Sequence, residues 1–485
     1  MKQAILKYLN HPRHLTLSFL LIFFIHLLFK SLYLDYAGFW YDETFGLWYS
    51  QQDWGLIKHT SEWDLNPPLY YYFLWIWRNL FGISEFSIRF SSVFFSSLSA
   101  ELIYIFSVKY FNKMTGLLAV LIFTASSNIL FFAHEARCYS LVLFLSLYSS
   151  WLFLALLNKK SYWTIIGLGI INFLLVYTHY LTGFILFFQV VIAILYKRKE
   201  FTKCLLFAYA ITVALCLWRF TVKTIALIFD HGKSFWLNKA GFYDLKMAFY
   251  DFFNGPVVLL IFILTISAAT GILLYKRKEL HFTGEEIIKF IYILLCGIVT
   301  VLICFIIGTQ TPVFLMRYLL YTSPFMYITV GYVLSLLPQQ AKYLGIGLVI
   351  IAFLYGIFNL DLKTEKSMDF RGAMPVLKKL ETPETAILVE TADVAPLFAY
   401  YYDKAVFANF YHMEEIMKEK RIFFVSSVAA LKEIDLKKYS KLILTQTFEK
   451  NNKECEQILK VLETEYRKKI TVYYYNEVNI LAFTR

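Results

Sequence analysis

Long apolar runs, separated by short polar stretches, dominate the sequence. A helix needs roughly 20 apolar residues to cross a bilayer, and the pattern contains about eleven such segments. This predicts a polytopic α-helical membrane protein. We expect membrane spans, each to within a few residues, at 15–34, 86–108, 114–133, 138–157, 162–178, 181–196, 204–224, 256–275, 287–307, 318–337 and 342–360.

The segment from Pro67 to Gly82 is also apolar, but it is short, aromatic-rich and carries Arg78. Loop charge decides how to interpret it. If this segment lies in the membrane interface, the short loops on one side of the membrane collect 16 lysines and arginines, as the positive-inside rule requires. If it crosses the membrane, every later loop changes side and the rule is violated repeatedly. We therefore predict a juxtamembrane helix on the outer face and a cytoplasmic N-terminus.

Residues 361–485 have a different composition, with two charged helical stretches at Phe370–Glu381 and Met413–Lys420. They predict a small α/β domain on the outer face, following a transmembrane domain over 1–360 whose first outer loop is 35–85. No glycine-rich phosphate loop suggests nucleotide binding. The strand-like runs are Ala386–Val389, Ile422–Val425, Leu442–Leu444 and Ile470–Tyr474.

Composition adds limits to this picture. The 485 residues are 59% hydrophobic and 17% charged, with a formal charge of +12. In a soluble protein that charge would suggest nucleic acid, but here the cations cluster between spans, so we expect no nucleic-acid partner. The six cysteines form no CxxC pair and no zinc spacing. The basic segment Met1–His14 lacks a small-residue cleavage site, which predicts an uncleaved first span.

Two polar islands stand beside bilayer-length segments: Trp40-Tyr41-Asp42-Glu43 and His134-Glu135-Ala136-Arg137. Acids and arginines cost several kcal/mol in lipid, so the islands indicate a wet cavity with a function. Asp42 is a candidate general base, a role that requires it within hydrogen-bond reach of an acceptor hydroxyl. The alternative for Asp42 and Glu43 is a pair of ordinary solvated loop acids.

The second island is more informative. Arg137 can pair with a phosphate through two parallel hydrogen bonds. Glu135 can orient that arginine, hold a metal ion or bind a sugar hydroxyl. The alternative is a local ion pair at the start of the span near residue 138. His134 is a weaker candidate, because an interfacial histidine often has no specific function.

Three further groups of polar residues precede or connect spans. Pro67 and Pro68 suit the first turn of the interfacial helix, where a missing N–H costs nothing, while Asn66 and Tyr70 are candidates to line a cleft. His179 lies in a very tight turn between two spans. It is a candidate metal ligand or a candidate hydrogen-bond donor to substrate, and the alternative is that it has no specific role.

Arg317, followed by Tyr318, opens a late span at the outer face. An arginine at that depth needs an anion, and a lipid phosphate is a natural partner. Snorkelling to bulk headgroups is the alternative. The stretch Lys233–Lys246 is interpreted as mostly solvated, with some contact to an acceptor.

Taken in order, WYDE, NPPLYYYFLWIWRNLFGISEFSIR, HEARCYSL, YTHYLTG and RYLLYTSPF resemble the bacterial members of the family 39 glycosyltransferases and their aminoarabinose-transferase relatives. These are protein mannosyltransferase-like enzymes of the GT-C fold, and the resemblance covers roughly residues 1–340. It implies a polyprenyl-phosphate-linked sugar donor and an outward-facing site in the plasma (bacterial inner) membrane. It also implies inverting transfer to a protein, lipid or glycan acceptor.

The resemblance assigns roles to individual residues. Asp42 matches the first-loop catalytic base, and Glu43 has a helping or metal-binding role. The sequence departs from the family at His134, where many relatives have glutamine, and it lacks a glutamate directly before Pro67, which weakens a metal site and a lipid A acceptor. Whether a divalent metal ion is needed, held by Asp42, Glu43 or Glu135, is left open. The implied contacts to donor phosphate and sugar are Glu135, Arg137, Tyr139, His179, Arg317 and Tyr318.

Two other classes of function were considered. A transporter or flippase for a lipid-linked glycan usually shows related halves and discontinuous mid-membrane helices, and this sequence shows no related halves. A non-catalytic scaffold presenting residues 361–485 leaves the outer acids and arginines without a role. The sequence does not identify the sugar or the acceptor.

Overall fold

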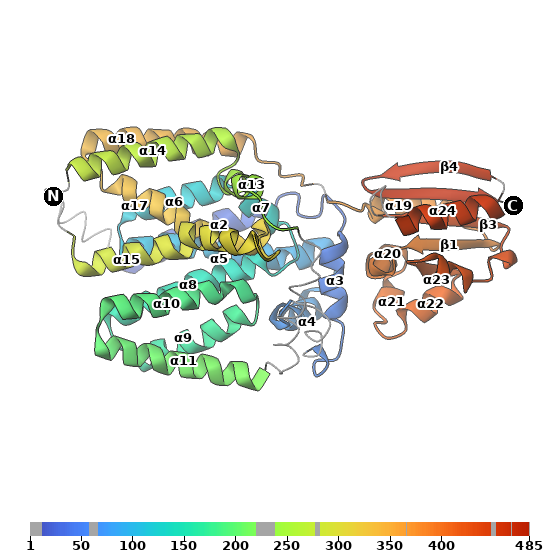
Figure 1. Ribbon diagram of the computed structural model, residues 1–485, viewed down its shortest axis with the longest axis horizontal. Helices are drawn as coiled ribbons and strands as arrows, with labels where there is room; N and C mark the ends of the chain where they lie inside the picture. The colour runs from blue at the N-terminus through green and yellow to red at the C-terminus, as the bar shows by residue number, and fades with distance from the viewer. Residues whose placement is uncertain are drawn as a thin grey trace. The chain divides into compact units, whose positions relative to one another are not determined.

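The computed structural model describes residues 12–57, 66–219, 238–276, 282–364, 366–447, 453–466 and 468–484. The chain divides into two compact units. The helical unit consists of Met1–Leu32, Lys58–Tyr70 and Arg89–Leu362, and the mixed unit consists of Tyr33–Ile57, Tyr71–Ile88 and Lys363–Arg485. Figure 1 labels the elements of both units.

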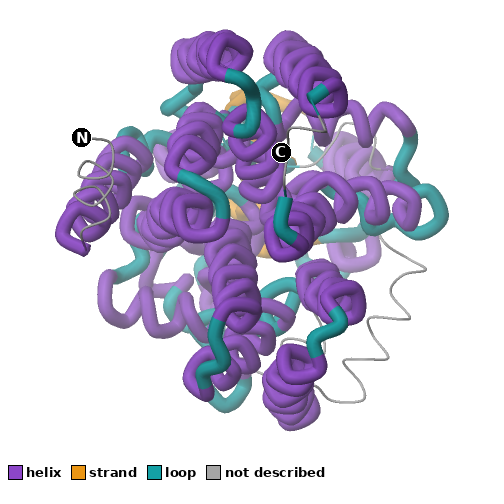
Figure 2. The backbone as a smooth tube through the Cα atoms, turned by 90° about the vertical axis from the view of Figure 1, so that its left-hand side faces the viewer, coloured by secondary structure: helices purple, strands orange, loops and turns teal. Residues whose placement is uncertain are grey.

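Apolar helices make up the helical unit, and Figure 2 views many of them nearly end-on. Within the described residues, each span predicted from the sequence overlaps one helix or a run of consecutive helices; the end of the predicted span 204–224 lies outside them. The helices of this unit are α2 (Pro12–Lys30), α5 (Glu85–Tyr110, in this unit from Arg89), α6 (Lys113–Ala125), α7 (Ser127–Ala133), α8 (Tyr139–Asn158), α9 (Tyr162–Val176), α10 (Gly183–Tyr196), α11 (Lys199–Arg219), α13 (Phe242–Phe252), α14 (Pro256–Tyr275), α15 (Gly284–Leu294), α16 (Thr300–Gly308), α17 (Ser323–Ser335) and α18 (Gln339–Phe358).

Among the described residues, six helices are long and apolar enough to cross a membrane, or seven if the bent pair α6–α7 is one span. Shorter apolar helices accompany them at Leu20–Lys30, Tyr162–Val176 and Tyr180–Tyr196. The chain is therefore a multi-pass membrane protein. The total of eleven spans and their orientation stay predictions.

Two of the predicted spans are interrupted. The α6 and α7 axes differ by 67°, and the hydroxyl of Ser126 caps α7 by accepting the N–H of Ile129. The helix through α15 and α16 contains a π-helical turn, η4 (Leu295–Val299), with irregular backbone at Gly297. A Cβ atom at Gly297 would lie 3.2 Å from Met326 of α17, so the glycine permits close packing at this break.

A closed ring of hydrogen bonds joins three consecutive helices of this unit. Ser149 of α8 donates to Asn172 of α9 at 2.6 Å, Asn172 donates to Gln189 of α10 at 3.1 Å, and Gln189 donates back to Ser149 at 2.8 Å. All three side chains are fully buried. Unsatisfied polar groups are costly in an apolar interior, and in this ring each side chain both donates and accepts.

The mixed unit contains a five-stranded sheet with the order β2-β1-β3-β5-β4. The strand β1 pairs in parallel with β2 and β3, while β5 pairs antiparallel with β3 and β4. Four of these strands overlap the strand-like runs named from the sequence, and the fifth, β5, was not identified there. The strands are β1 (Thr385–Glu390), β2 (Ile422–Val425), β3 (Lys441–Gln446), β4 (Lys468–Tyr475) and β5 (Val478–Thr484).

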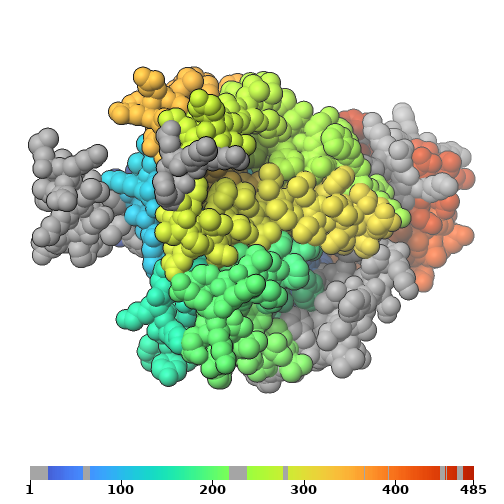
Figure 3. Space-filling model, turned by 60° about the vertical axis from the view of Figure 1, so that its left-hand side comes forward, coloured from blue at the N-terminus to red at the C-terminus, as the bar shows by residue number. Residues whose placement is uncertain are grey.

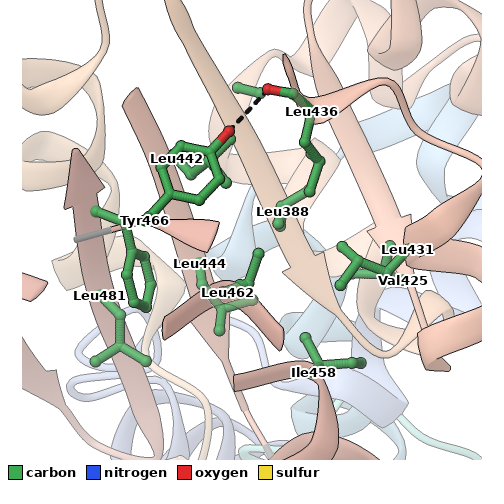
Figure 4. Close-up of a cluster of buried hydrophobic side chains, with 12 residues drawn as sticks. Leu388, Val425, Leu431, Leu436, Leu442, Leu444, Ile458, Leu462, Tyr466 and Leu481 are labelled. Carbon is green, nitrogen blue, oxygen red and sulfur yellow. Dashed lines mark hydrogen bonds between the residues drawn. The ribbon is translucent and has the colours of Figure 1, made fainter. Parts of the chain in front are cut away.

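Helices cover both faces of this sheet. Side chains alternate along a strand, so Leu388 and Leu444 pack with Ile458 and Leu462 of α24, as Figure 4 shows. In the same cluster the hydroxyl of Tyr466 donates to the carbonyl of Leu436 at 2.7 Å. The helices of this unit are α3 (Tyr41–Tyr49), α4 (Leu69–Phe81, in this unit from Tyr71), α19 (Phe370–Leu380), α20 (Ala395–Tyr402), α21 (Lys404–Phe407), α22 (Met413–Glu419), α23 (Val428–Lys432) and α24 (Lys453–Glu465).

Most of the first polar loop, with α3 and the greater part of α4, packs with the C-terminal residues in this unit. The hydroxyl of Tyr401 donates to the carboxylate of Glu85 at 3.0 Å, and the hydroxyl of Tyr400 donates to the carbonyl of Ile83 at 2.8 Å. The amide of Gln51 donates to the carbonyl of Phe407 at 3.0 Å. The sequence analysis assigned all of 1–360 to the transmembrane domain, whereas Tyr33–Ile57 and Tyr71–Ile88 belong to the compact unit that contains Lys363–Arg485.

Candidate functional site

The turn between α7 and α8 carries His134, Glu135 and Arg137, and all three are buried. The Nε2 atom of His134 donates to the carbonyl of Lys30 at 2.8 Å. Ser92 of α5 donates to the carbonyls of Glu135 at 2.7 Å and Arg137 at 3.4 Å. Ser92 of α5 therefore binds the backbone of this turn, and the His134 side chain ties the turn to the end of α2, so Glu135 and Arg137 are held between two neighbouring helices.

His179 lies in the turn after α9 and is also buried. The pKa of its imidazole is lowered to about 4, mainly by burial and also by the positive charges of Arg137 and Arg317. The imidazole is therefore neutral near pH 7 and can donate or accept a hydrogen bond. Both guanidinium groups lie close enough to His179 to contribute to this shift.

The third segment is the 3₁₀ helix η5 (Met316–Thr322), which carries Arg317 and Tyr318. The rings of His179 and Tyr318 lie 5.0 Å apart, and the guanidinium of Arg317 lies 5.7 Å from the Tyr318 ring centroid. The hydroxyl of Tyr321 donates to the carbonyl of Leu181 at 2.8 Å. Three predicted elements, far apart in the sequence, therefore meet in the helical unit: the turns at 134–138 and 177–182, and η5.

The start of α4 joins this group. The N–H of Leu69 donates to the carbonyl of Tyr177 at 3.2 Å, which holds the Asn66–Tyr70 segment beside the turn of His179. Tyr70 is buried and Asn66 is partly exposed. Tyr139 is buried at the first turn of α8, one residue after the turn at 134–138.

The sequence analysis gave no site role to three polar residues of α2 and α5, although one of them, Arg89, ends the second motif quoted there. Lys30, at the end of α2, is buried; its ammonium donates to Ser96 at 2.7 Å and lies 4.4 Å from the Phe123 ring centroid. Ser92, described above, lies one turn earlier on α5. Arg89 is fully buried a further turn back. The one local signal for these residues was the serine-rich sequence of α5, because their partners are distant in the chain.

Asp42 and Glu43 belong to the mixed unit and lie in the first turn of α3. Glu43 is fully buried, and its carboxylate accepts the N–H of Trp40 at 3.3 Å, which caps the helix. Asp42 is partly exposed. The carbonyl of Ser50, after α3, accepts the guanidinium of Arg78 at 3.1 Å. Acidic side chains are favourable at a helix N-terminus, so the first turn of α3 is a suitable place for Asp42 and Glu43.

An apolar cavity of about 450 Å³ lies in the helical unit between α13, α14, α15 and α17. Of its lining side chains, Lys246, Ser267 and Thr329 are polar. Two of the walls, α14 in yellow-green and α15 in yellow, run along the face seen in Figure 3. The helix α13 packs against both α7 and η5, so it connects this cavity to the elements that precede Arg137 and carry Arg317. Lys233, the other end of the predicted basic stretch, lies outside the described residues.

Metal binding receives no geometric support from the described part of the chain, where no three His, Cys, Asp or Glu side chains gather as ligands. Glu135 shares its surroundings with Arg137 and Arg317, whose charges repel a cation. Among the described residues of the helical unit, the surroundings of Glu135 therefore do not fit a divalent metal ion.

Comparison with known proteins identifies the class of fold. Residues 65–221 match the sequence model described as dolichyl-phosphate-mannose-protein mannosyltransferase. The chain has the GT-C fold, which is the fold of membrane glycosyltransferases of this kind. No curated protein matches the chain.

The similarity to solved structures extends over nearly the whole chain. ArnT from Cupriavidus metallidurans bound to undecaprenyl phosphate has a TM-score of 0.60 and 12% identity, and the alignment covers 97% of this chain and 98% of ArnT. Its apo state has the same score and identity. AglB, an oligosaccharyltransferase from Archaeoglobus fulgidus in complex with an inhibitory peptide and a dolichol-phosphate, has a TM-score of 0.52 and 10% identity over 93% of this chain and 70% of AglB.

Proposed function

We propose that the chain is an inverting glycosyltransferase that moves a sugar from a polyprenyl-phosphate carrier to a protein, lipid or glycan acceptor. The observation that carries this proposal is the packing of η5, which carries Arg317, against both α8, which follows Arg137, and the turn of the buried His179. Two guanidinium groups at one place in a membrane protein call for an anion. The carrier phosphate has the charge that arginine binds, and two of its oxygens can accept the paired donors of the planar guanidinium.

The apolar cavity beside α13 supports a lipid-linked donor. Its size of about 450 Å³ and its mostly apolar lining suit part of an isoprenoid chain. Lys246 supplies one positive charge among these apolar side chains. The packing of α13 on α7 and η5 allows a chain in the cavity to place its phosphate near the arginines.

The residues supply the steps of a single displacement. Arg137 and Arg317 stabilise the negative charge that develops on the departing phosphate, while Glu135 orients a guanidinium or binds a sugar hydroxyl. Neutral His179 and the hydroxyls of Tyr139 and Tyr318 contact the donor. Asp42 takes the proton of the acceptor hydroxyl as this attacks the anomeric carbon from the opposite face, which inverts the configuration.

The orientation and compartment are part of the same proposal. The loop-charge argument assigns the N-terminus to the cytoplasm and the sheet-containing residues after 360 to the outer side of a plasma (bacterial inner) membrane. A divalent metal ion takes part in none of the proposed steps. Besides Glu135, the candidate metal ligands from the sequence analysis are Asp42, Glu43 and His179.

The test is mass spectrometry of the polyprenyl-phosphate pool in cells without the protein, with wild type, and with Asp42→Asn. One polyprenyl-phosphate sugar should accumulate in the first and third strains but not in the second. That result identifies the donor and assigns Asp42 to the chemistry. An equal pool in all three strains contradicts the proposal and favours a lipid-linked glycan transporter, for which uptake of labelled glycan into vesicles is the direct assay.

A further inference from the structure

A second cavity, of about 460 Å³, lies in the mixed unit and has a different character from the apolar one. One wall is the segment 36–39, which follows α2 along the chain, and the other wall is the segment 366–372, which leads into α19. Asn476, in the turn between β4 and β5, completes the lining. Cavities of this size hold small molecules or the polar heads of larger ones.

Hydrogen bonds from different parts of the chain hold the walls in place. The guanidinium of Arg371 donates to the carbonyl of Asp35 at 2.7 Å, which joins one wall to the other. Asn476 donates to the carbonyl of Lys366 at 2.9 Å, and its own carbonyl accepts the N–H of Asp369 at 2.9 Å. The cavity is therefore formed before any ligand enters.

Gly38 shows how closely the walls approach. A Cβ atom at this position would lie 2.8 Å from the hydroxyl of Tyr401 and 3.0 Å from Cβ of Arg371. Any side chain here would push the 36–39 segment away from Arg371. Position 38 therefore needs a glycine, and the close approach of the two walls keeps Arg371 beside the cavity.

Positive charge dominates the lining. Lys366 is 7% exposed and Arg371 is exposed, so one cation lies deep and the other at the rim. Lys363 lies 5.2 Å and 5.7 Å from the ring centroids of Tyr33 and Tyr36, the latter a lining residue. The acid in the lining, Asp369, accepts the N–H of Gly372 at 2.8 Å and caps α19.

The position of the cavity along the chain indicates where its ligand comes from. The helix α18, which is apolar and long enough to cross a membrane, ends at Phe358, and Lys363 and Lys366 follow within a few residues. The other wall follows the end of α2 at Lys30 equally closely. Tyrosine and lysine directly beyond membrane helices are typical of the headgroup layer.

We propose that this cavity binds the phosphate of an anionic membrane lipid, with Lys366 and Arg371 holding the anion and Ser367 and Asn476 available to headgroup hydroxyls. The site is separate from the arginine cluster of the helical unit and does not depend on the proposed transfer reaction. Lysine and arginine close to a membrane surface attract anionic lipids. A bound lipid would hold the start of α19, and the sheet that packs against α19, at the headgroup layer.

The experiment uses the full-length protein in detergent and counts bound lipid by native mass spectrometry. The probes are dioctanoyl-phosphatidylglycerol, dioctanoyl-phosphatidylcholine and inorganic phosphate. Wild type should bind phosphatidylglycerol at least tenfold more tightly than phosphatidylcholine. The variant Lys366→Gln with Arg371→Gln should lose that preference, and Lys366→Arg should keep it.

A matched control removes two exposed lysines of the same unit, Lys379→Gln with Lys432→Gln, and should bind like wild type. Because Lys366 is buried, Arg371→Gln alone serves as a second variant if the double variant is unstable, and it should still weaken binding severalfold. Equal binding of phosphatidylglycerol to wild type and to the Lys366 and Arg371 variants overturns the proposal. Displacement of all bound lipid by millimolar inorganic phosphate overturns the lipid assignment and gives the site to the free anion.

Discussion

The Nε2–H of His134 and the carbonyl oxygen of Lys30 form a hydrogen bond of 2.8 Å between the end of α2 and the turn that carries Glu135 and Arg137. The bond is buried, and the Lys30 side chain is itself bound to Ser96 of α5. His134 therefore acts through the backbone, and we expect it to position the arginine-bearing turn.

Replacing His134 should separate this positioning role from substrate contact. His134→Ala leaves a buried carbonyl without its donor, which costs about 1–3 kcal/mol and should lower both the melting temperature and the transfer rate. His134→Gln can offer an amide N–H at a similar reach and should restore most of both. A His134→Gln variant with wild-type melting temperature and no transfer would instead assign His134 to the substrate.

Loss of one arginine of the cluster should affect chemistry more than binding. We expect Arg137→Gln or Arg317→Gln to lower kcat roughly 10²–10³-fold, the usual effect of removing one group that stabilises developing charge. Arg137→Lys should recover little, because a lysine lacks the two-pronged geometry. Arg198→Gln, an exposed surface ion-pair residue, is the control. A kcat within a few-fold of wild type in both cluster variants would remove them from the mechanism.

Asp42→Asn should abolish transfer without unfolding the protein. Loss of a general base typically costs about 10²–10⁴-fold in rate, and Asp42 is partly exposed, so the amide should be accommodated. Asp53→Asn, an exposed acid of the same unit, should leave the rate unchanged. Transfer of labelled sugar by purified Asp42→Asn at a near wild-type rate would exclude Asp42 as the base.

His179 gives a prediction about pH and stability. Its pKa is about 4 in the folded protein and 6.5 in the unfolded chain. As pH falls from 6.5 to 4, the unfolded chain takes up the proton first, so the folded state loses stability over this window, by about 3 kcal/mol in full. Above pH 6.5 the contribution vanishes.

The variant His179→Gln cannot titrate, and its melting temperature should fall less than that of wild type between pH 7.5 and pH 5. If the melting temperatures of wild type and His179→Gln fell equally between pH 7.5 and pH 5, His179 would take up its proton as readily in the folded state as in the unfolded chain, which contradicts the prediction. Activity at pH 7.5 tests donor contact separately, because both side chains are neutral there.

Filling the apolar cavity should discriminate between donors by chain length. Ser267→Phe adds a ring to the lining, and we expect the KM for a long-chain polyprenyl-phosphate sugar to rise several-fold while that for a two-isoprene donor stays constant. Leu264→Phe is the control, since Leu264 lies on the same helix, exposed and outside the lining. Equal effects on both donors would argue that the chain binds elsewhere.

The helices were predictable because bilayer-length apolar runs are local signals. The strands β1, β2, β3 and β4 were visible as short runs for the same reason. The strand β5 was missed, because its place between β3 and β4 depends on antiparallel partners rather than on its own sequence. The association of α3 and α4 with the C-terminal sheet was also invisible, because it rests on Tyr400 and Tyr401, more than 300 residues away from their partners.

In the candidate site, too, features with a local sequence signal were predictable and features that depend on distant partners were not. The segments containing Glu135, Arg137, His179 and Arg317 could be chosen as candidates from the sequence because polar or charged residues beside an apolar run are unusual. The role of His134 was not, since its partner is a backbone carbonyl 104 residues earlier. Lys30 was missed because nothing in an apolar helix end distinguishes a buried lysine from a snorkelling one.

The ring formed by Ser149, Asn172 and Gln189 has a consequence for biogenesis. Its members come from α8, α9 and α10, which are made one after the other with only short turns between them. Before the third of these helices is inserted, Asn172 faces lipid or the translocon with an incomplete set of partners. Once α10 enters the bilayer the ring closes, so these three helices can leave the insertion machinery as one group without waiting for the rest of the chain. Replacing Gln189 by leucine should therefore reduce the yield of inserted protein more than it changes the activity of the molecules that insert.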